Sequence, residues 1–557
     1  MAAPASTELS HFRLCLACFR WEKPTDMSRI GEAWRGVLAG NSRGRPGLYL
    51  FVAVACLNFA GMSREVPWGD ARPVFEVAES MVHGRGVSVR TRWPSDVPPA
   101  PDGRFYAAQP WLPALLHLPG LLLCAPLSHA SVGSEVAHLR DALSCHLAGS
   151  LLGALVAWLF FRLCLRHGAS PPVARFAAIL LAVGSMVWVY ARSPFTEIVQ
   201  AACFTGFFLE LTQLARRLDR RTALAVGIWA GLLLNTKYIY ALCLPGALLV
   251  VVLAHWKTRR PLLAAVAYAA AGLLPGLLMT LLYNYLRFGD VTRTGYSNLG
   301  HVMVENIFMG TWGFLFSPGK SLLLYTPPLA LAVLGCLRFG RAHRWSALAM
   351  LVTILPVVLF YACFPSWSGD WAWGPRYLVF AIPVLLLPGI SFLSNMRWPG
   401  RWLAAAVLVV GLGVQVLGNA FYWDHYLRIV LDVRTKWLGQ VNRTGALTVD
   451  KGGYCEGCFE DVYPMVWLPP FQPILGHFWL IRHVPFHDDW KQARLDAPWR
   501  RHTRLDFDAQ GTWDRVRMDH WLYDTRQYRS LGWMVLILLA GTGTVAGVVF
   551  VRRTRAG

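Results

Sequence analysis

Repeated long apolar runs are the feature that most constrains the fold of this 557-residue chain. A helix needs about 20 apolar residues to cross the roughly 30 Å hydrocarbon core of a bilayer. Runs of about that length recur along the chain and are bounded by Arg, Trp, Tyr and Pro, as is typical of spans that end at a membrane interface. Because 55% of the residues are hydrophobic and only 15% are charged, the composition excludes an ordinary soluble enzyme. We therefore predict an all-α polytopic membrane protein.

Twelve of these runs are candidate transmembrane helices. They cover approximately residues 47–63, 142–165, 172–190, 195–214, 222–235, 238–255, 261–285, 321–338, 345–363, 377–394, 402–422 and 531–551. A thirteenth run, 111–127, is interrupted by three prolines and a glycine. If it crossed the membrane, the basic cluster 216–221 would lie on the side opposite the basic N-terminus, against the positive-inside rule. We therefore predict about 12 spans, both termini in the cytoplasm, and a broken interfacial or re-entrant segment around 106–127.

This topology divides the chain into four parts. They are a cytoplasmic N-terminal segment 1–46, a transmembrane catalytic module 47–422 with an external loop 64–141, an external segment 423–530, and the last span with a basic cytoplasmic tail, 531–557. All the long polar segments then lie on the external, periplasmic side, where we expect the chemistry. We also expect interfacial helices in the first loop. We place the protein in the cell inner (plasma) membrane.

The net charge of +21 raises the question of nucleic acid. The basic residues cluster in short loops beside the apolar runs, which is the pattern that orients membrane helices. We therefore expect no nucleic-acid partner. Cys455 and Cys458 lie in the long external segment, where an external disulfide is favoured over a zinc site because no second Cys pair or His pair is near.

Asp70, in the first external loop, is the leading candidate for a catalytic base. It precedes residues 72–83, whose apolar positions recur at helical spacing and predict a helix on the membrane surface. The alternative is that Asp70 only caps this helix, a position that Asp fills well.

Several short segments resemble GT-C glycosyltransferases of the protein O-mannosyltransferase and lipid A aminoarabinose transferase type, bacterial branch. An acidic residue in the first loop followed by an amphipathic helix ending near His-Gly is one of them. Segment 106–111, Tyr-Ala-Ala-Gln-Pro-Trp, resembles their Tyr-Ser-x-Lys-Pro-Pro element, with Gln109 where many relatives have Lys. Further similar stretches are 192–197, 283–289, 316–321 and 367–377.

The resemblance implies transfer of a sugar from a polyprenyl-phosphate donor to a glycan, a lipid-linked saccharide or a protein hydroxyl on the external face, with inversion. In that reaction Asp70 and Glu197 are the catalytic candidates. Basic residues near the ends of spans are candidates for binding the donor phosphate: Arg376, Lys320, Lys237 and Arg287. Substrate contacts are expected from Glu76, His83, Tyr106, Asp370 and Trp371.

Alternatives remain for several of these residues. Lys320 and Arg376 are also placed to snorkel toward lipid headgroups, and Glu197 or Asp370 to form a structural ion pair with Arg192 or Arg376. No metal site is predicted, and a divalent-metal requirement stays open. A transporter or flippase of lipid-linked sugars, or a non-catalytic subunit of an envelope assembly complex, is the alternative function, although a transporter ordinarily carries ionisable groups near mid-membrane and paired halves.

Overall fold

The fold is almost entirely helical. The computed structural model describes residues 46–64, 69–90, 100–125, 134–296, 306–443 without 365, 370 and 371, 463–484, 493, 495–500, 516, 518–519 and 529–553. Within these residues, strands β1 (Ser88–Val89) and β2 (Phe105–Tyr106) form one small antiparallel sheet in the first loop. The prediction of an all-α polytopic membrane protein is confirmed.

Each of the twelve predicted runs coincides with helix. The helices are α2 (Pro46–Ala60), α5 (Ser134–Arg166), α6 (Pro171–Gly184), α7 (Met186–Ala191), α8 (Glu197–Leu214), α9 (Arg220–Leu234), η2 (Tyr238–Leu242), α10 (Cys243–His255), α11 (Arg259–Phe288), α13 (Leu322–Tyr325), α14 (Leu329–Ala342), α15 (Arg344–Ala362), η4 (Arg376–Ala381), α16 (Ile382–Leu386), α17 (Gly389–Ser394), α18 (Trp398–Ala420) and α24 (Arg529–Arg553). Among the described residues, seven helical stretches are long and apolar enough to cross a membrane. The other runs form shorter or more polar helices, so the number of crossings stays a prediction.

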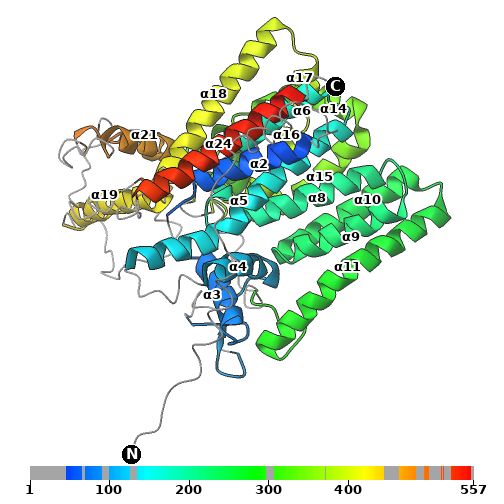
Figure 1. The fold of residues 1–557 in the computed structure, drawn as a ribbon, viewed down its shortest axis with the longest axis horizontal. Helices are drawn as coiled ribbons and strands as arrows, with labels where there is room; N and C mark the ends of the chain where they lie inside the picture. Colours follow the sequence, from blue (N-terminus) through cyan, green and yellow to red (C-terminus); the bar gives the residue numbers. More distant parts are fainter. Residues whose placement is uncertain are drawn as a thin grey trace, which may run out of the picture.

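The remaining helices lie in the segments predicted to be external. They are α3 (Ala71–Val82), α4 (Trp111–Cys124), α12 (Ile307–Phe316), α19 (Trp423–Arg443), α20 (Tyr463–Trp467), η6 (Pro469–Phe471) and α21 (Pro473–His483). In Figure 1, α3, α4, α19 and α21 gather toward the end of the bundle that lies away from the C-terminal end of α24. The predictions for residues 1–45 and for Cys455 and Cys458 concern residues outside the described ones.

The segment expected to be broken by its prolines is instead one continuous helix, α4, with Pro119 inside it. Its 14 residues are too few to cross a bilayer, for which about 20 are needed. It packs against α3 and α5. Gly120 allows the close contact with α5, since a Cβ there would lie 2.3 Å from the Ser144 carbonyl oxygen.

The end of the segment between α18 and α24 is attached to the bundle through Asp519. Its buried carboxylate accepts a hydrogen bond from Ser63 Oγ at 2.7 Å and pairs with Arg192 at 3.5 Å. Its backbone N–H donates to the Ala420 carbonyl. The acidic partner of Arg192 is therefore Asp519, which sequence spacing did not suggest.

Helices α9 and α11 form the most extensive helix pair, and small residues bring them together. Gly227 and Gly231 on α9 face Gly272 and Gly276 on α11, each pair spaced by four residues. A Cβ on Gly227 would lie 1.9 Å from the Ala269 carbonyl oxygen. This is the small-residue packing that lets membrane helices approach closely. This helix pair positions Lys237, which follows the end of α9, and Arg287, which lies in the last turn of α11.

Replacing Gly227 by Ala should therefore push α9 away from α11 and destabilise the protein by about 1–3 kcal/mol. The measurement is the thermal unfolding of purified protein in detergent. Gly413→Ala on α18 is the matched control, because nothing lies within 4 Å of a Cβ there. Equal melting temperatures for the two variants would contradict close packing at Gly227.

Candidate functional site

Asp70 and Arg376, 306 residues apart in sequence, join the loop after α2 to the bundle. Arg376 Nη2 donates to Asp70 Oδ2 at 2.8 Å. The Asp70 side chain is 57% exposed whereas that of Arg376 is only 5% exposed. Although Asp70 stands at the N-cap position of α3, its side chain makes no capping hydrogen bond. Its carboxylate faces Arg376, which favours the functional interpretation over the capping one.

The turn before Arg376 is fixed on two sides. Lys320 Nζ donates to the carbonyls of Ala372 at 2.6 Å and Gly374 at 3.2 Å. Gly369 adopts the left-handed conformation, with φ +70°, and a Cβ on it would lie 2.6 Å from Arg376 Cγ. The guanidinium is thus packed in place by backbone that only glycine allows.

Aromatic rings surround the cationic groups. Arg376 Cζ lies 5.3 Å from the ring centroid of Phe195 and 5.0 Å from that of Tyr377. Tyr377 stacks on Tyr361 with centroids 4.4 Å apart, and Lys237 Nζ lies 4.8 Å and 5.4 Å from these two centroids. Cations above ring faces are stabilised by the ring quadrupole. Sequence analysis missed Phe195 and Tyr361; their only signal was their position at the predicted external ends of two apolar runs.

Glu197 completes the charged group, which we call the Asp70 cluster: Asp70, Glu197, Lys237 and Arg376. Glu197 is the first residue of α8, 4% exposed, and its electrostatic neighbours are Arg376, Lys237 and Asp70. Its Oε2 has no hydrogen-bond partner among the described residues. Packing of α8 against η4 brings Glu197 and Arg376 to the same end of the bundle. A buried acceptor oxygen without a donor favours a site that binds a hydroxyl or another donor group.

Neighbouring positive charges lower the pKa of the Asp70 carboxyl group. Desolvation by the surrounding protein raises its pKa, but the positive charges of Arg376 and Lys237 and the hydrogen bond from Arg376 outweigh this, so that the pKa of Asp70 lies below its usual value. Asp70 is therefore ionised at neutral pH.

Two residues predicted to bind the donor phosphate are engaged elsewhere. Lys320 is 2% exposed and donates to the carbonyls of the 372–374 turn. Arg287 is 1% exposed and donates to the carbonyls of Ala107 and Gln109 and to Asn284 Oδ1. Both support the backbone around the Asp70 cluster. The Gln109 side chain donates to the Asp70 carbonyl at 3.2 Å.

The residues expected to contact substrate in the first loop have local partners. Glu76 is buried and accepts from Arg72 Nε and from the Arg90 N–H. His83 bonds the Glu79 carbonyl at the end of α3. Tyr106 donates to Asp102, and burial together with this hydrogen bond raises the pKa of Tyr106 to about 12.

These contacts give Glu76 and Tyr106 a structural role in the first loop. Asp370 and Trp371 lie outside the described residues. Within the part of the chain that the structure describes, no group of three or more His, Cys, Asp or Glu side chains is arranged to hold a metal ion.

Comparison with known proteins gives little. No protein-family model matches the chain, and no curated protein matches it. Among solved structures, an oligosaccharyltransferase from Archaeoglobus fulgidus, crystallised with zinc and sulfate, aligns at 12% identity with a TM-score of 0.38. The alignment covers 72% of this chain and 57% of that chain. So weak a likeness assigns no function to this chain.

The lowered pKa of Asp70 predicts a pH-dependent stabilisation. Its unfolded pKa is about 3.9, and the folded value lies below it, so the ionised form stabilises the fold fully above the unfolded pKa. Its contribution is lost as the pH falls through the folded pKa. The difference in melting temperature between the wild type and Asp70→Asn should therefore be constant above about pH 5 and shrink toward pH 3.

The control for this measurement is the same comparison in an Arg376→Gln background. Without the guanidinium, the main charge that lowers the Asp70 pKa is gone, so Asp70→Asn should have a weaker pH-dependent effect. An unchanged pH dependence in this background would contradict the assigned ion pair.

Proposed function

We propose that this chain is a membrane glycosyltransferase of the GT-C type that transfers a sugar from a polyprenyl-phosphate donor to a hydroxyl acceptor, with inversion. The observation that carries the proposal is the Asp70–Arg376 pair, a half-exposed carboxylate held by a buried guanidinium at a predicted external membrane face. A sugar transfer from a lipid phosphate needs a base for the acceptor and cations for the leaving phosphate. The Asp70 cluster offers both within one group of neighbouring side chains.

Arg376 and Lys237 are suited to hold the donor phosphate. A guanidinium binds phosphate oxygens through a rigid set of donors, and an ammonium adds a mobile point charge. The aromatic rings beside them keep both cations in place without neutralising them. A phosphate arriving at this position competes with Asp70 for Arg376.

That competition prepares the base. When Arg376 turns to the phosphate, Asp70 loses the hydrogen bond and part of the positive potential that lower its pKa, so its proton affinity rises. Asp70 then accepts the proton of the acceptor hydroxyl, whose oxygen bonds to the anomeric carbon. The bond between that carbon and the phosphate oxygen breaks, and its electron pair stays on the lipid phosphate. Attack from the side opposite the leaving group inverts the configuration.

Glu197 is placed to bind the sugar. Its buried Oε2, which has no hydrogen-bond partner among the described residues, is available to accept a hydrogen bond from a sugar hydroxyl. The donor is a polyprenyl-phosphate sugar, and the acceptor is a glycan, a lipid-linked saccharide or a protein hydroxyl. The predicted external orientation places this reaction on the periplasmic side of the plasma membrane.

Asp70→Asn should abolish transfer while the protein remains folded, because an amide cannot accept the hydroxyl proton. Loss of a positioned general base lowers the rate by about 10²- to 10⁴-fold. The measurement is transfer of radiolabelled sugar from polyprenyl phosphate by purified protein, with a melting curve to check folding. The same assay distinguishes a transferase from a flippase or a non-catalytic subunit, which would leave the sugar on its carrier.

Asp102→Asn is the matched control, since Asp102 is a half-exposed carboxylate of the same loop whose partners are Arg104 and Tyr106. It should retain transfer. Near-normal turnover in Asp70→Asn would remove Asp70 from the role of base.

Gly369→Ala tests the placement of Arg376. The added Cβ meets Arg376 Cγ, so the guanidinium moves off the phosphate position. Misplacement on the ångström scale costs up to about 10²-fold in rate, and we expect a fall of at least tenfold in kcat/KM for the donor. Gly84→Ala carries the same left-handed backbone penalty, with φ +67°, but its Cβ would meet nothing within 4 Å. Equal activities would show that the Arg376 position does not limit the reaction.

A further inference from the structure

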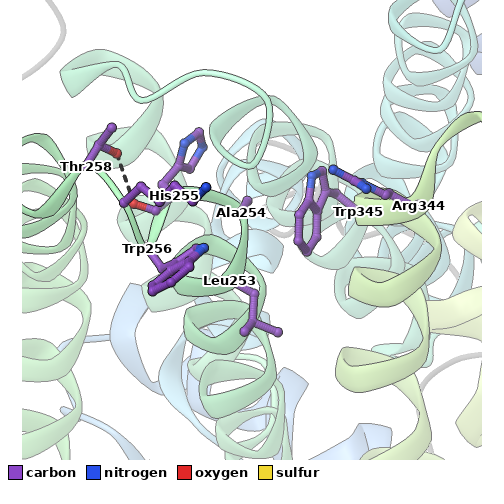
Figure 2. Close-up of a pocket in the computed structure, with 8 residues that line it drawn as sticks. Leu253, Ala254, His255, Trp256, Thr258, Arg344 and Trp345 are labelled. Carbon is purple, nitrogen blue, oxygen red and sulfur yellow. Dashed lines mark hydrogen bonds between the residues drawn. The ribbon is translucent and has the colours of Figure 1, made fainter.

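A basic recess lies at the opposite end of two helices that reach the Asp70 cluster. It is a cavity of about 460 Å³ lined by Leu253 to Thr258, at the end of α10 and in the following turn, and by Arg344 and Trp345, which begin α15. Figure 2 shows the two groups of side chains on either side of the space. This volume is in the range of small-ligand sites, roughly 300–1,000 Å³. Nothing in the proposed transfer reaction uses it.

The distance between the two sites is close to the hydrocarbon thickness of a bilayer. Lys237, in the Asp70 cluster, directly precedes η2 and α10, and Tyr361, beside Lys237, lies in the last turn of α15. From Tyr361 back to Arg344 is 17 residues of α-helix, or about 26 Å at 1.5 Å per residue. That length is close to the roughly 30 Å hydrocarbon thickness of a bilayer. The cavity therefore lies at the level of the other membrane interface.

The lining has the chemistry of an anion site. Lys257 and Arg344 face it, and none of the eight described lining residues is acidic. Each cation lies over a tryptophan: Lys257 Nζ is 5.8 Å from the ring centroid of Trp256, and Arg344 Cζ is 5.0 Å from that of Trp345. Unlike the Asp70 cluster, this recess has no carboxylate to compete with an incoming anion.

The turn that carries Lys257 is held in shape by its own hydrogen bonds. The Thr258 hydroxyl and its backbone N–H both donate to the His255 carbonyl at 2.9 Å. The His255 ring bonds the Leu214 carbonyl at 3.0 Å, which ties the turn to α8. Hydrogen-bonded backbone therefore positions Lys257 at the recess.

Apolar surface continues from the recess toward the membrane interior. Leu249 and Leu253 on α10, and Leu351 and Leu355 on α15, are all more than 40% exposed. These surfaces match the parts of a phospholipid in order. The exposed leucines suit the acyl chains, the tryptophans suit the interface, and the cations suit the headgroup. A free phosphate ion would use the cations but not the leucines.

We propose that this recess binds the phosphate headgroup of an anionic phospholipid, whose acyl chains lie along α10 and α15. Lys257 and Arg344 contact the phosphate, while Trp256 and Trp345 flank the headgroup at the interface. The site is separate from the Asp70 cluster and does not depend on the proposed transfer activity.

The test titrates the purified full-length protein in neutral detergent with phosphatidylglycerol or phosphatidylcholine and counts bound lipids by native mass spectrometry. The wild type should prefer phosphatidylglycerol. Lys257→Gln/Arg344→Gln should weaken phosphatidylglycerol binding by about tenfold or more and leave phosphatidylcholine binding unchanged. Lys257→Arg/Arg344→Lys, which keeps both charges, should retain the preference, and melting curves report whether each variant is folded.

Arg338→Gln/Arg341→Gln is the matched control, since it removes two exposed cations of α14 that do not line the cavity. It should change phosphatidylglycerol binding by less than about twofold. An equal loss in this control, an undiminished preference in Lys257→Gln/Arg344→Gln, or displacement of the lipid from the wild type by millimolar inorganic phosphate would each overturn the proposal. The last result would assign the recess to a soluble anion.

Discussion

The architecture of the site depends on one ion pair, that between Asp70 and Arg376. The guanidinium is buried at the end of an apolar helix bundle, where an uncompensated charge costs several kcal/mol. It therefore needs an acidic partner, and Asp70 supplies one from a loop outside the bundle. The surrounding contacts serve this geometry: Lys320 fixes the turn that carries Arg376, and Gln109 holds the Asp70 backbone.

The same pair explains how a lowered pKa is compatible with a role as base. A carboxylate paired with a guanidinium is a weak proton acceptor. In the proposed reaction, a bound phosphate would take over the guanidinium and leave the carboxylate less stabilised. Substrate binding would then activate the base through charge exchange. Half-exposure of Asp70 leaves the acceptor a route to it.

The sequence predicted the apolar helices well because burial in a bilayer demands long apolar runs. It could not predict where they break: extended Ser185 separates α6 from α7, and α4 continues through Pro119. For the site, Asp70 and Arg376 were singled out as candidates by their positions beside spans, and the structure pairs them. The partners of Lys320 and Arg287 were not predicted, because a position near a helix end does not reveal whether a cation meets lipid, substrate or a backbone carbonyl.

The Asp70 cluster and the recess around Lys257 and Arg344 differ in a way that suits different occupants. In the Asp70 cluster, Asp70 already pairs with Arg376, so in the proposed reaction a phosphate would have to displace this carboxylate, and the carboxylate would return as the product phosphate leaves. Around Lys257 and Arg344 no carboxylate lines the cavity, and an anion that enters has no internal competitor. The first arrangement suits the proposed turnover, and the second suits stable occupancy. Since α10 and α15 run between the two sites, we infer that charge balance distinguishes the proposed reactive site from the proposed lipid site on the same pair of helices.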